Sequence, residues 1–138
     1  MTVFFEDLTI GQSASTGKTI TEADILLFAA VSTDVNPVHM NAEMAAGTIF
    51  KERIAHGMLS AGLISAVLGN QLPGPGTVYL AQSLRFRAPV KIGQTVTATV
   101  EVLSLDAEKK RATFKTVCTV DGKPVIEGEA TVMVPTRS

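Results

Sequence analysis

The sequence predicts an α+β fold in which an antiparallel sheet wraps around one buried helix. Residues 57–68 are apolar or small at nearly every position, which is typical of a helix with no face toward water. After this segment the hydrophobic period changes from helical to two, and the alternation recurs over several short runs. The turns between these runs are too short to hold crossover helices, so the strands are expected to be antiparallel.

Length and composition indicate one domain that spans residues 1–138. A chain of 138 residues has the commonest domain size, and 46% of its residues are hydrophobic. The net charge of −1 gives no reason to expect nucleic acid or an anionic membrane as a partner. The single cysteine, Cys118, excludes an intrachain disulfide and falls in an alternating segment typical of a core. The first residues have neither the basic nor the apolar stretch of a signal peptide, so we expect a cytoplasmic protein.

The first element that the sequence predicts is a helix after Thr21. Thr21 is a favourable N-cap, and the acidic residues that follow it suit the positive end of a helix dipole. Residues 25–31 continue this helix. Residues 32–39 are expected to form a loop, because Asn36 precedes a proline and the segment is polar. A short helical turn over 41–46, closed by Gly47, follows.

The buried helix begins at Gly57 and ends at Gly69-Asn70. It is too short to cross a bilayer, which takes about 20 apolar residues. Alternating strands are then expected over 79–87, 95–102, 111–120 and 124–134, with Asp121-Gly122 as a hairpin turn. One buried helix followed by such a meander is the hot-dog arrangement, and its open sheet edge favours the pairing of two subunits.

The first candidate for chemistry is the loop 32–39, which holds Asp34 and His39. On a turn, a carboxylate and an imidazole five residues apart can converge on one point. Together they supply a proton acceptor, a proton donor and an orienting partner near neutral pH. The alternative is a capped turn, in which Asp34 accepts bonds from backbone N–H groups and His39 is only a packed residue.

The second candidate is His56-Gly57, directly before the buried helix. A helix N-terminus presents unpaired N–H groups and a partial positive charge, and a glycine there lets a ligand approach the backbone. Negative charge that develops on a carbonyl oxygen would be stabilised at such a point. The alternative is that Gly57 permits tight packing and His56 caps the helix. Because Asp34, His39 and His56 lack a tight ligand spacing, we expect no metal site, and no cofactor motif is present.

Taken together, these segments resemble the MaoC-like (R)-specific enoyl-CoA hydratases, of the short-chain, polyhydroxyalkanoate type. Residues 28–39 are similar to the hydratase-2 motif, with its Asp-x-Asn-Pro-x-His core at 34–39. Residues 53–58 and 82–90 match in the same order, so that the resemblance covers about residues 5–134. One departure is Thr33, where many members carry glycine. We expect this residue to alter the turn rather than the chemistry.

The resemblance implies a hot-dog homodimer that hydrates trans-2-enoyl-CoA to (R)-3-hydroxyacyl-CoA, reversibly. Asp34 and His39 would bond the reacting water and return a proton to C2, and the Gly57 N–H would hold the thioester oxygen. Asn36 would help to orient the dyad. The residues assigned to substrate binding are Asn36, Arg53, His56, Ser65 and Leu68, the last two as the border of the acyl pocket. The candidates for contact with the coenzyme A phosphates are Lys51, Arg53, Arg85, Arg87 and Lys91.

Three other functions stay open at this point. A dehydratase of acyl-carrier-protein thioesters runs the same chemistry in reverse. A hot-dog thioesterase usually places a carboxylate on or near the central helix, whereas residues 57–68 contain no Asp or Glu. A non-catalytic acyl-thioester binding module would keep the pocket but would not need an Asp–His dyad.

Overall fold

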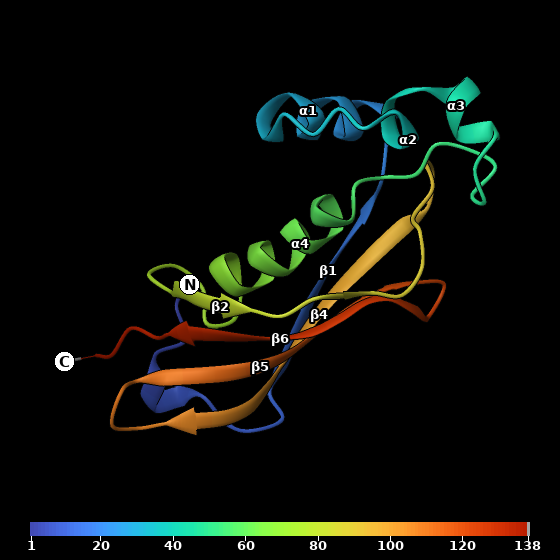
Figure 1. Cartoon of the computed structure of the whole chain (residues 1–138). Helices are drawn as coiled ribbons and strands as arrows, with labels where there is room; N and C mark the ends of the chain where they lie inside the picture. Colours follow the sequence, from blue (N-terminus) through green and yellow to red (C-terminus); the bar gives the residue numbers. More distant parts are fainter. Residues whose placement is uncertain (138) are drawn as a thin grey trace.

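The computed structural model describes residues 1–137 as one antiparallel sheet with the helices on one side (Figure 1). The elements in chain order are the 3-10 helix η1 (Phe5–Asp7), β1 (Ser13–Thr19), α1 (Glu22–Ser32), α2 (Pro37–Met40), α3 (Ala42–Ala46), α4 (Gly57–Asn70), β2 (Val78–Gln82), β3 (Arg85–Phe86), β4 (Thr95–Asp106), β5 (Arg111–Val120) and β6 (Lys123–Met133). Helix α4 lies across the sheet, so the predicted α+β hot-dog arrangement is confirmed. Among residues 1–137, no helix is both long enough and apolar enough to cross a membrane.

The sheet has the strand order β1-β4-β5-β6-β2, and β3 also pairs with β6. The alternation predicted for 95–102 is confirmed in β4, where Val96, Ala98 and Val100 are buried and the threonines between them are not. The hairpin between β5 and β6 is also confirmed. Asp121 and Gly122 both have positive φ, 52° and 77°, as a tight two-residue turn requires.

Strand β1 is not predicted by the sequence pattern. Its residues are mostly polar (Ser-Ala-Ser-Thr-Gly-Lys-Thr), so no apolar alternation marks it as a strand. It forms because β4 offers an edge, and the two strands pair in register from Ser13 opposite Glu101 to Thr19 opposite Thr95. Tertiary pairing therefore decides the structure of this segment.

The hydrophobic core lies between α4 and the sheet. Ile64, Val67 and Leu68 of α4 are fully buried in one cluster with apolar side chains of the sheet, such as Phe114. Cys118 belongs to this cluster, as predicted, and burial raises the pKa of its thiol to about 11. The thiol therefore stays protonated at neutral pH and packs as a small apolar group.

The other face of α4 is open to solvent, so the prediction that this helix is buried on all sides is wrong for the single chain. Met58 is 54% exposed, and Gly62, Ser65 and Gly69 are exposed as well. The reason is geometric, because one sheet covers only one face of a helix. The apolar composition of the open face is therefore not explained by packing within the chain.

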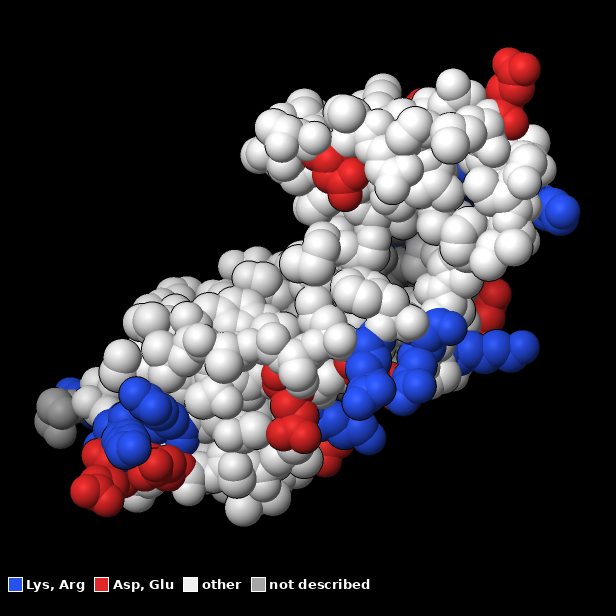
Figure 2. Space-filling view, viewed as in Figure 1, with Lys and Arg blue, Asp and Glu red and all other residues white. Residues whose placement is uncertain are grey.

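Strand β2 lies at an edge of the sheet, next to this open face. The single strand expected over 79–87 is divided in the structure into β2 and the short strand β3. In β2, Val78, Tyr79 and Leu80 are 47%, 39% and 41% exposed. Neither α4 nor β2 contains a charged residue, and Figure 2 shows an almost uncharged surface over these elements. An apolar edge strand thus continues an apolar helix face.

The connection from β2 to β3 passes very close to β6. A Cβ atom on Gly128 would lie 1.8 Å from the carbonyl oxygen of Ser83, so only glycine fits at this crossing. The N–H of Ser83 donates to the carbonyl of Glu129 at 2.9 Å, and the Ser83 hydroxyl accepts from the N–H of Glu129 at 3.0 Å. The crossing leads the chain into residues 86–90, which form one wall of the cavity described next.

Candidate active site

Helices α1, α2 and α3 overhang one end of the sheet, and the surface is hollowed between them and the rest of the molecule (Figures 1 and 2). A cavity of about 380 Å³ is lined by residues 54–58, by residues 86–90 and by the side chains of Asp34 and His39. Phe50, Ser60 and Ile126 complete the lining, and none of them was indicated by the sequence. The cavity therefore combines an apolar wall with ionisable side chains, among them the predicted pair Asp34 and His39.

The loop that carries Asp34 begins where α1 ends. Thr21 caps the start of α1 in a capping box with Asp24, as the sequence predicts for this N-cap. At the other end, Thr33 adopts a left-handed conformation, with φ 64° and ψ 11°, and turns the chain out of the helix. The N–H of Asp34 then donates to the Ser32 hydroxyl at 3.1 Å. The chain direction at Asp34 is therefore set by the C-terminus of α1.

The second half of the loop is helical, which corrects the prediction of a loop up to residue 39. Asn36 caps the short helix α2, its side-chain oxygen accepting from the N–H of Val38 at 3.1 Å, and Pro37 occupies the first helical position. The N–H of Asn36 also donates to Oδ1 of Asp34 at 3.3 Å. Asn36 thus orients Asp34 and α2 through its cap and its backbone, and the structure gives no support to its assignment to the substrate.

The ring of His39 is held by a backbone carbonyl. Its Nδ1 lies 2.8 Å from the carbonyl oxygen of Ile54. A carbonyl oxygen can only accept, so Nδ1 carries the proton and Nε2 is the unprotonated nitrogen of the neutral ring. The nitrogen that can accept a proton is therefore Nε2.

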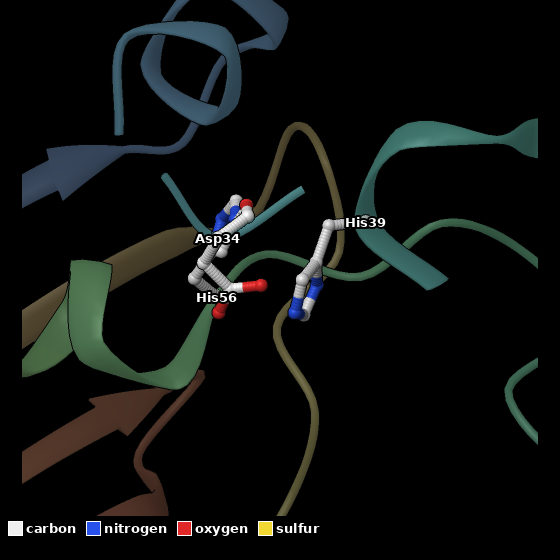
Figure 3. Close-up of side chains that lie close together, drawn as sticks. All are labelled: Asp34, His39 and His56. Atoms are coloured by element: carbon white, nitrogen blue, oxygen red, sulfur yellow. Dashed lines mark hydrogen bonds between the residues drawn. The ribbon is translucent and has the colours of Figure 1, made fainter. Parts of the chain in front are cut away.

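His56 lies against His39, and Figure 3 shows it converging with Asp34 and His39 from three segments of the chain. The two imidazole rings stack with centroids 4.0 Å apart and an interplanar angle of 30°. His56 is only 2% exposed, and its Nε2 lies 2.8 Å from the carbonyl oxygen of Asp34. It therefore supports the backbone of Asp34 and packs against His39, and because it also lines the cavity, its contact with substrate stays a prediction.

The spacing argument against a metal site is wrong, because the fold brings together residues that the sequence keeps apart. One nitrogen or oxygen atom from each of Asp34, His39 and His56 lies within 4.8 Å of the other two. The ring arrangement opposes a metal site on other grounds. The lone pair of an imidazole lies in the ring plane, so two stacked rings direct their lone pairs side by side rather than at one ion. The carbonyl bonds by themselves do not oppose a metal, because each engages one nitrogen of a ring and leaves the other nitrogen available.

Gly57 is the first residue of α4 and lines the cavity. The first N–H groups of a helix have no acceptor within the helix, so they are available to a ligand at this end. The ring of Phe86 packs directly over the backbone here. A Cβ atom on residue 57 would lie 2.5 Å from Cε1 and 2.6 Å from Cδ1 of Phe86, which explains why glycine occupies the position.

The structure does not bring Ser65 and Leu68 to this cavity. With a helical rise of 1.5 Å per residue, Ser65 lies about 12 Å further along α4 than Gly57. It is exposed on the open face of the helix, and Leu68 is buried in the core at 1% exposure. We expected them to border the acyl pocket because we treated the whole of α4 as its wall. In the structure only the first turn of α4 lines the cavity.

The basic candidates are placed in different surroundings. Arg87 lines the cavity and pairs with Glu127 at 3.1 Å. Arg85 lies beside it in a neighbouring groove. Lys51 and Arg53 line a different groove, and the largely buried Arg53 side chain bonds to the backbone of His39 beside the cavity. Lys91 is 3.6 Å from Glu52. Of the predicted phosphate contacts, Arg87 is the one at the cavity.

Comparison with known proteins gives consistent matches over nearly the whole chain. Residues 7–128 match the family described as "MaoC like domain". The "(R)-specific enoyl-CoA hydratase" of Rhodospirillum rubrum is 66% identical, over 97% of this chain and 93% of that protein. The R-hydratase PhaJ1 from Pseudomonas aeruginosa, solved without ligand, has a TM-score of 0.93 at 49% identity, covering 99% of this chain and 88% of that one.

Two further matches bear on the choice of carrier. The (R)-hydratase from Aeromonas caviae, described as involved in PHA biosynthesis, has a TM-score of 0.91 at 45% identity and covers 94% of this chain and 99% of that one. A mitochondrial protein of Solanum lycopersicum named "3-hydroxyacyl-[acyl-carrier-protein] dehydratase FERN" is more distant. It is 35% identical over 93% of this chain and 78% of its own.

Proposed function

The chain belongs to the family of MaoC-like domains, and we propose that it hydrates trans-2-enoyl-CoA to (R)-3-hydroxyacyl-CoA, with Asp34 and His39 as its acid–base pair. The observation that carries this proposal is that the Asp34 carboxylate and the His39 ring line one cavity whose wall includes the first residue of α4. The relatives named (R)-specific enoyl-CoA hydratase support the reaction. The protein is accordingly a hydro-lyase.

The pair acts on one water molecule. Nε2 of His39 accepts one hydrogen of the water, and the Asp34 carboxylate, whose Oδ1 also receives the Asn36 N–H, accepts the other. The water oxygen forms a bond to C3 as the C2–C3 π bond breaks. The electron pair of that π bond moves toward the thioester oxygen and gives an enolate. The proton that the water loses to the pair is then delivered to C2. Both additions come from the same side of the substrate, which gives syn hydration.

The start of α4 stabilises the enolate. Negative charge grows on the thioester oxygen as the water adds, and the N–H of Gly57 donates to that oxygen. The positive end of the helix dipole adds to the effect. The acid–base pair and this donor lie on different segments around the same cavity, so the substrate is held between them.

The alternative functions have less support. A dehydratase of acyl-carrier-protein thioesters uses the same groups in reverse, but the relatives so named are more distant. A thioesterase with a carboxylate on the central helix has no counterpart here, because α4 contains no Asp or Glu. A module that only binds thioesters would not need Asp34 and His39 together at the cavity.

Several finer assignments stay predictions of ours. Arg87 and Arg85, at the cavity and in the groove beside it, are the candidates for contact with the coenzyme A phosphates. The assignment of residues 1–138 to one domain and the cytoplasmic location rest on the sequence alone.

A homodimer is part of the proposal. The open face of α4 and the exposed edge strand β2 are apolar, uncharged and next to each other. Burying such a surface against a second copy removes it from water and pairs an open sheet edge. A closed two-fold dimer would therefore explain why α4 is apolar on both faces.

The reaction itself is tested with purified protein and crotonyl-CoA. We expect loss of the conjugated absorbance and formation of the (R) enantiomer of 3-hydroxybutyryl-CoA, separated by chiral chromatography. Saturated butyryl-CoA should release no free thiol above background, because α4 has no carboxylate to attack the thioester or to direct water at it. Thiol release from butyryl-CoA at the rate of crotonyl-CoA consumption would contradict the hydratase and favour the thioesterase.

The acid–base pair is tested by Asp34→Asn and His39→Ala. Each change removes a proton acceptor while leaving the core untouched, so turnover should fall roughly 10²–10⁴-fold. Because the two groups act on the same water, the double variant should be little worse than the poorer single variant. Circular dichroism and thermal unfolding check that the fold is retained. A variant that kept more than about a tenth of the wild-type rate would remove that residue from the assigned role.

The role of Gly57 is tested by Gly57→Ala, alone and combined with Phe86→Ala. The added methyl group collides with the Phe86 ring and obstructs the approach of the thioester oxygen, so we expect turnover to fall roughly 10²-fold. Removing the ring relieves the collision but not the obstruction, and the double variant should stay slow. Gly17→Ala on β1 is the matched control, because a Cβ there makes only ordinary contacts, the nearest 3.6 Å from Oγ1 of Thr97. Full recovery in the double variant would assign Gly57 to packing alone.

Assembly is tested by sedimentation at micromolar concentration. We expect a particle of twice the 14.5 kDa chain mass. Leu80→Glu places a charge on the proposed interface and should shift the protein toward monomer. Leu103→Glu is the control, since Leu103 is similarly exposed, 39% against 41% for Leu80, but lies on β4. A wild-type protein that sediments as a monomer would exclude the dimer.

A further inference from the structure

Arg53 is a basic residue beside the active site whose side chain is bonded to the protein itself. Its Nε donates to the carbonyl oxygen of His39 at 2.6 Å. Its Nη1 donates to both carboxylate oxygens of Glu22, at 3.0 and 2.8 Å. The side chain is only 15% exposed. The guanidinium group therefore joins the first residue of α1 to the backbone of His39 on α2.

The residues that follow Arg53 hold the same part of the chain. The N–H of Ile54 donates to the carbonyl of Val38 at 3.3 Å, and the carbonyl of Ile54 accepts from Nδ1 of His39. The N–H of Ala55 donates to the carbonyl of Val90 at 2.7 Å, which anchors this stretch to the wall of the cavity. His39 is thus held through both its backbone and its ring by residues 53 and 54.

We propose that Arg53 is a positioning residue for the acid–base pair: anchored on Glu22, it fixes the backbone of His39 and so the direction of its ring. This inference rests on the proposed function, because it assigns Arg53 to the proton transfer at Nε2 of His39. A rotation of α2 about its cap would carry Nε2 away from the reacting water. Misplacement of a reacting group by about 1 Å can cost on the order of 10²-fold in rate.

The guanidinium group suits this task in a way that lysine does not. Its Nε and Nη1 hydrogens leave a rigid plane in fixed directions, so one side chain reaches two acceptors on different helices at the same time. A lysine keeps the charge but is a single flexible point. The charge of Arg53 is also already paired with Glu22 and lies outside the cavity lining, which separates this role from the phosphate contact that the sequence suggested.

The first test measures kcat and KM of Arg53→Lys and Glu22→Gln with two substrates. Crotonyl-CoA carries the coenzyme phosphates, and crotonyl-N-acetylcysteamine lacks them. For Arg53→Lys we expect kcat to fall about 10- to 100-fold on both substrates, with KM little changed. Glu22→Gln keeps one acceptor and should give a smaller fall in kcat, again on both substrates. Arg111→Gln, which removes one positive charge at the start of β5, is the control and should behave as wild type.

The outcomes are distinct. A defect confined to KM for crotonyl-CoA, and absent with the truncated thioester, would assign Arg53 to phosphate binding and overturn the proposal. Unchanged kcat on both substrates would overturn it as well. Thermal unfolding identifies any variant that has lost its fold, and Glu22→Gln changes a side chain that is 51% exposed, so it provides the test where Arg53→Lys is unstable.

The second test does not depend on the reaction. Long-range 15N–1H spectra of the imidazole rings distinguish the two neutral tautomers. In the wild-type protein we expect His39 to carry its proton on Nδ1, bonded to Ile54. Arg53→Lys should shift the ring toward the Nε2-protonated form as that bond is loosened. An unchanged tautomer in both variants would refute the positioning role, whereas failure of the wild-type protein to hydrate crotonyl thioesters would refute the proposed function instead.

Discussion

The hydrogen bond from Nδ1 of His39 to the carbonyl of Ile54 is the interaction on which the active site depends. It determines which nitrogen of the neutral ring carries the proton, and therefore which one is available as an acceptor for the water of the proposed reaction. Ile54 is bridged to Lys91, and its neighbour Ala55 donates to Val90, so the carbonyl does not move independently of the chain that forms the cavity wall. A flexible imidazole on an overhanging helix is in this way tied to the wall that the substrate must contact.

The same stretch of chain holds the other half of the pair. Nε2 of His56 donates to the carbonyl of Asp34, and Nε of Arg53 donates to the carbonyl of His39. Residues 53–56 thus contact the backbone of both Asp34 and His39, and the side chains of these two residues line the cavity. The next residue, Gly57, begins α4 and presents its N–H groups to the same space. One short segment therefore sets the spacing between Asp34 and His39, the proposed acid–base pair, and Gly57, the proposed oxyanion donor.

The sequence predicted the parts of this site that are encoded locally. Asp34 and His39 belong to one turn whose shape follows from Asn36-Pro37, and the helix start at Gly57 is marked by the apolar run after it. The roles of Arg53 and His56 could not be predicted, because each bonds a backbone carbonyl 14 or 22 residues away. Every residue has a carbonyl, so no residue type in the sequence marks the acceptor. In α4, likewise, the apolar pattern predicted burial but did not indicate what covers each face of the helix.

Thr33 turns the chain before Asp34 in a conformation that costs backbone strain. A β-branched residue at φ 64° is strained, by about 1–2 kcal/mol relative to a right-handed conformation. Bonds on the C-terminal side oppose the relaxation of this strain: the Asp34 N–H to Ser32, the Asn36 N–H to the Asp34 carboxylate, and His56 to the Asp34 carbonyl. Glycine would remove the strain, but it would also give the loop more conformations to lose when the site is formed. Threonine has fewer backbone conformations available than glycine. Although it is locally unfavourable, it therefore leaves Asp34 fewer orientations other than the one that faces the cavity.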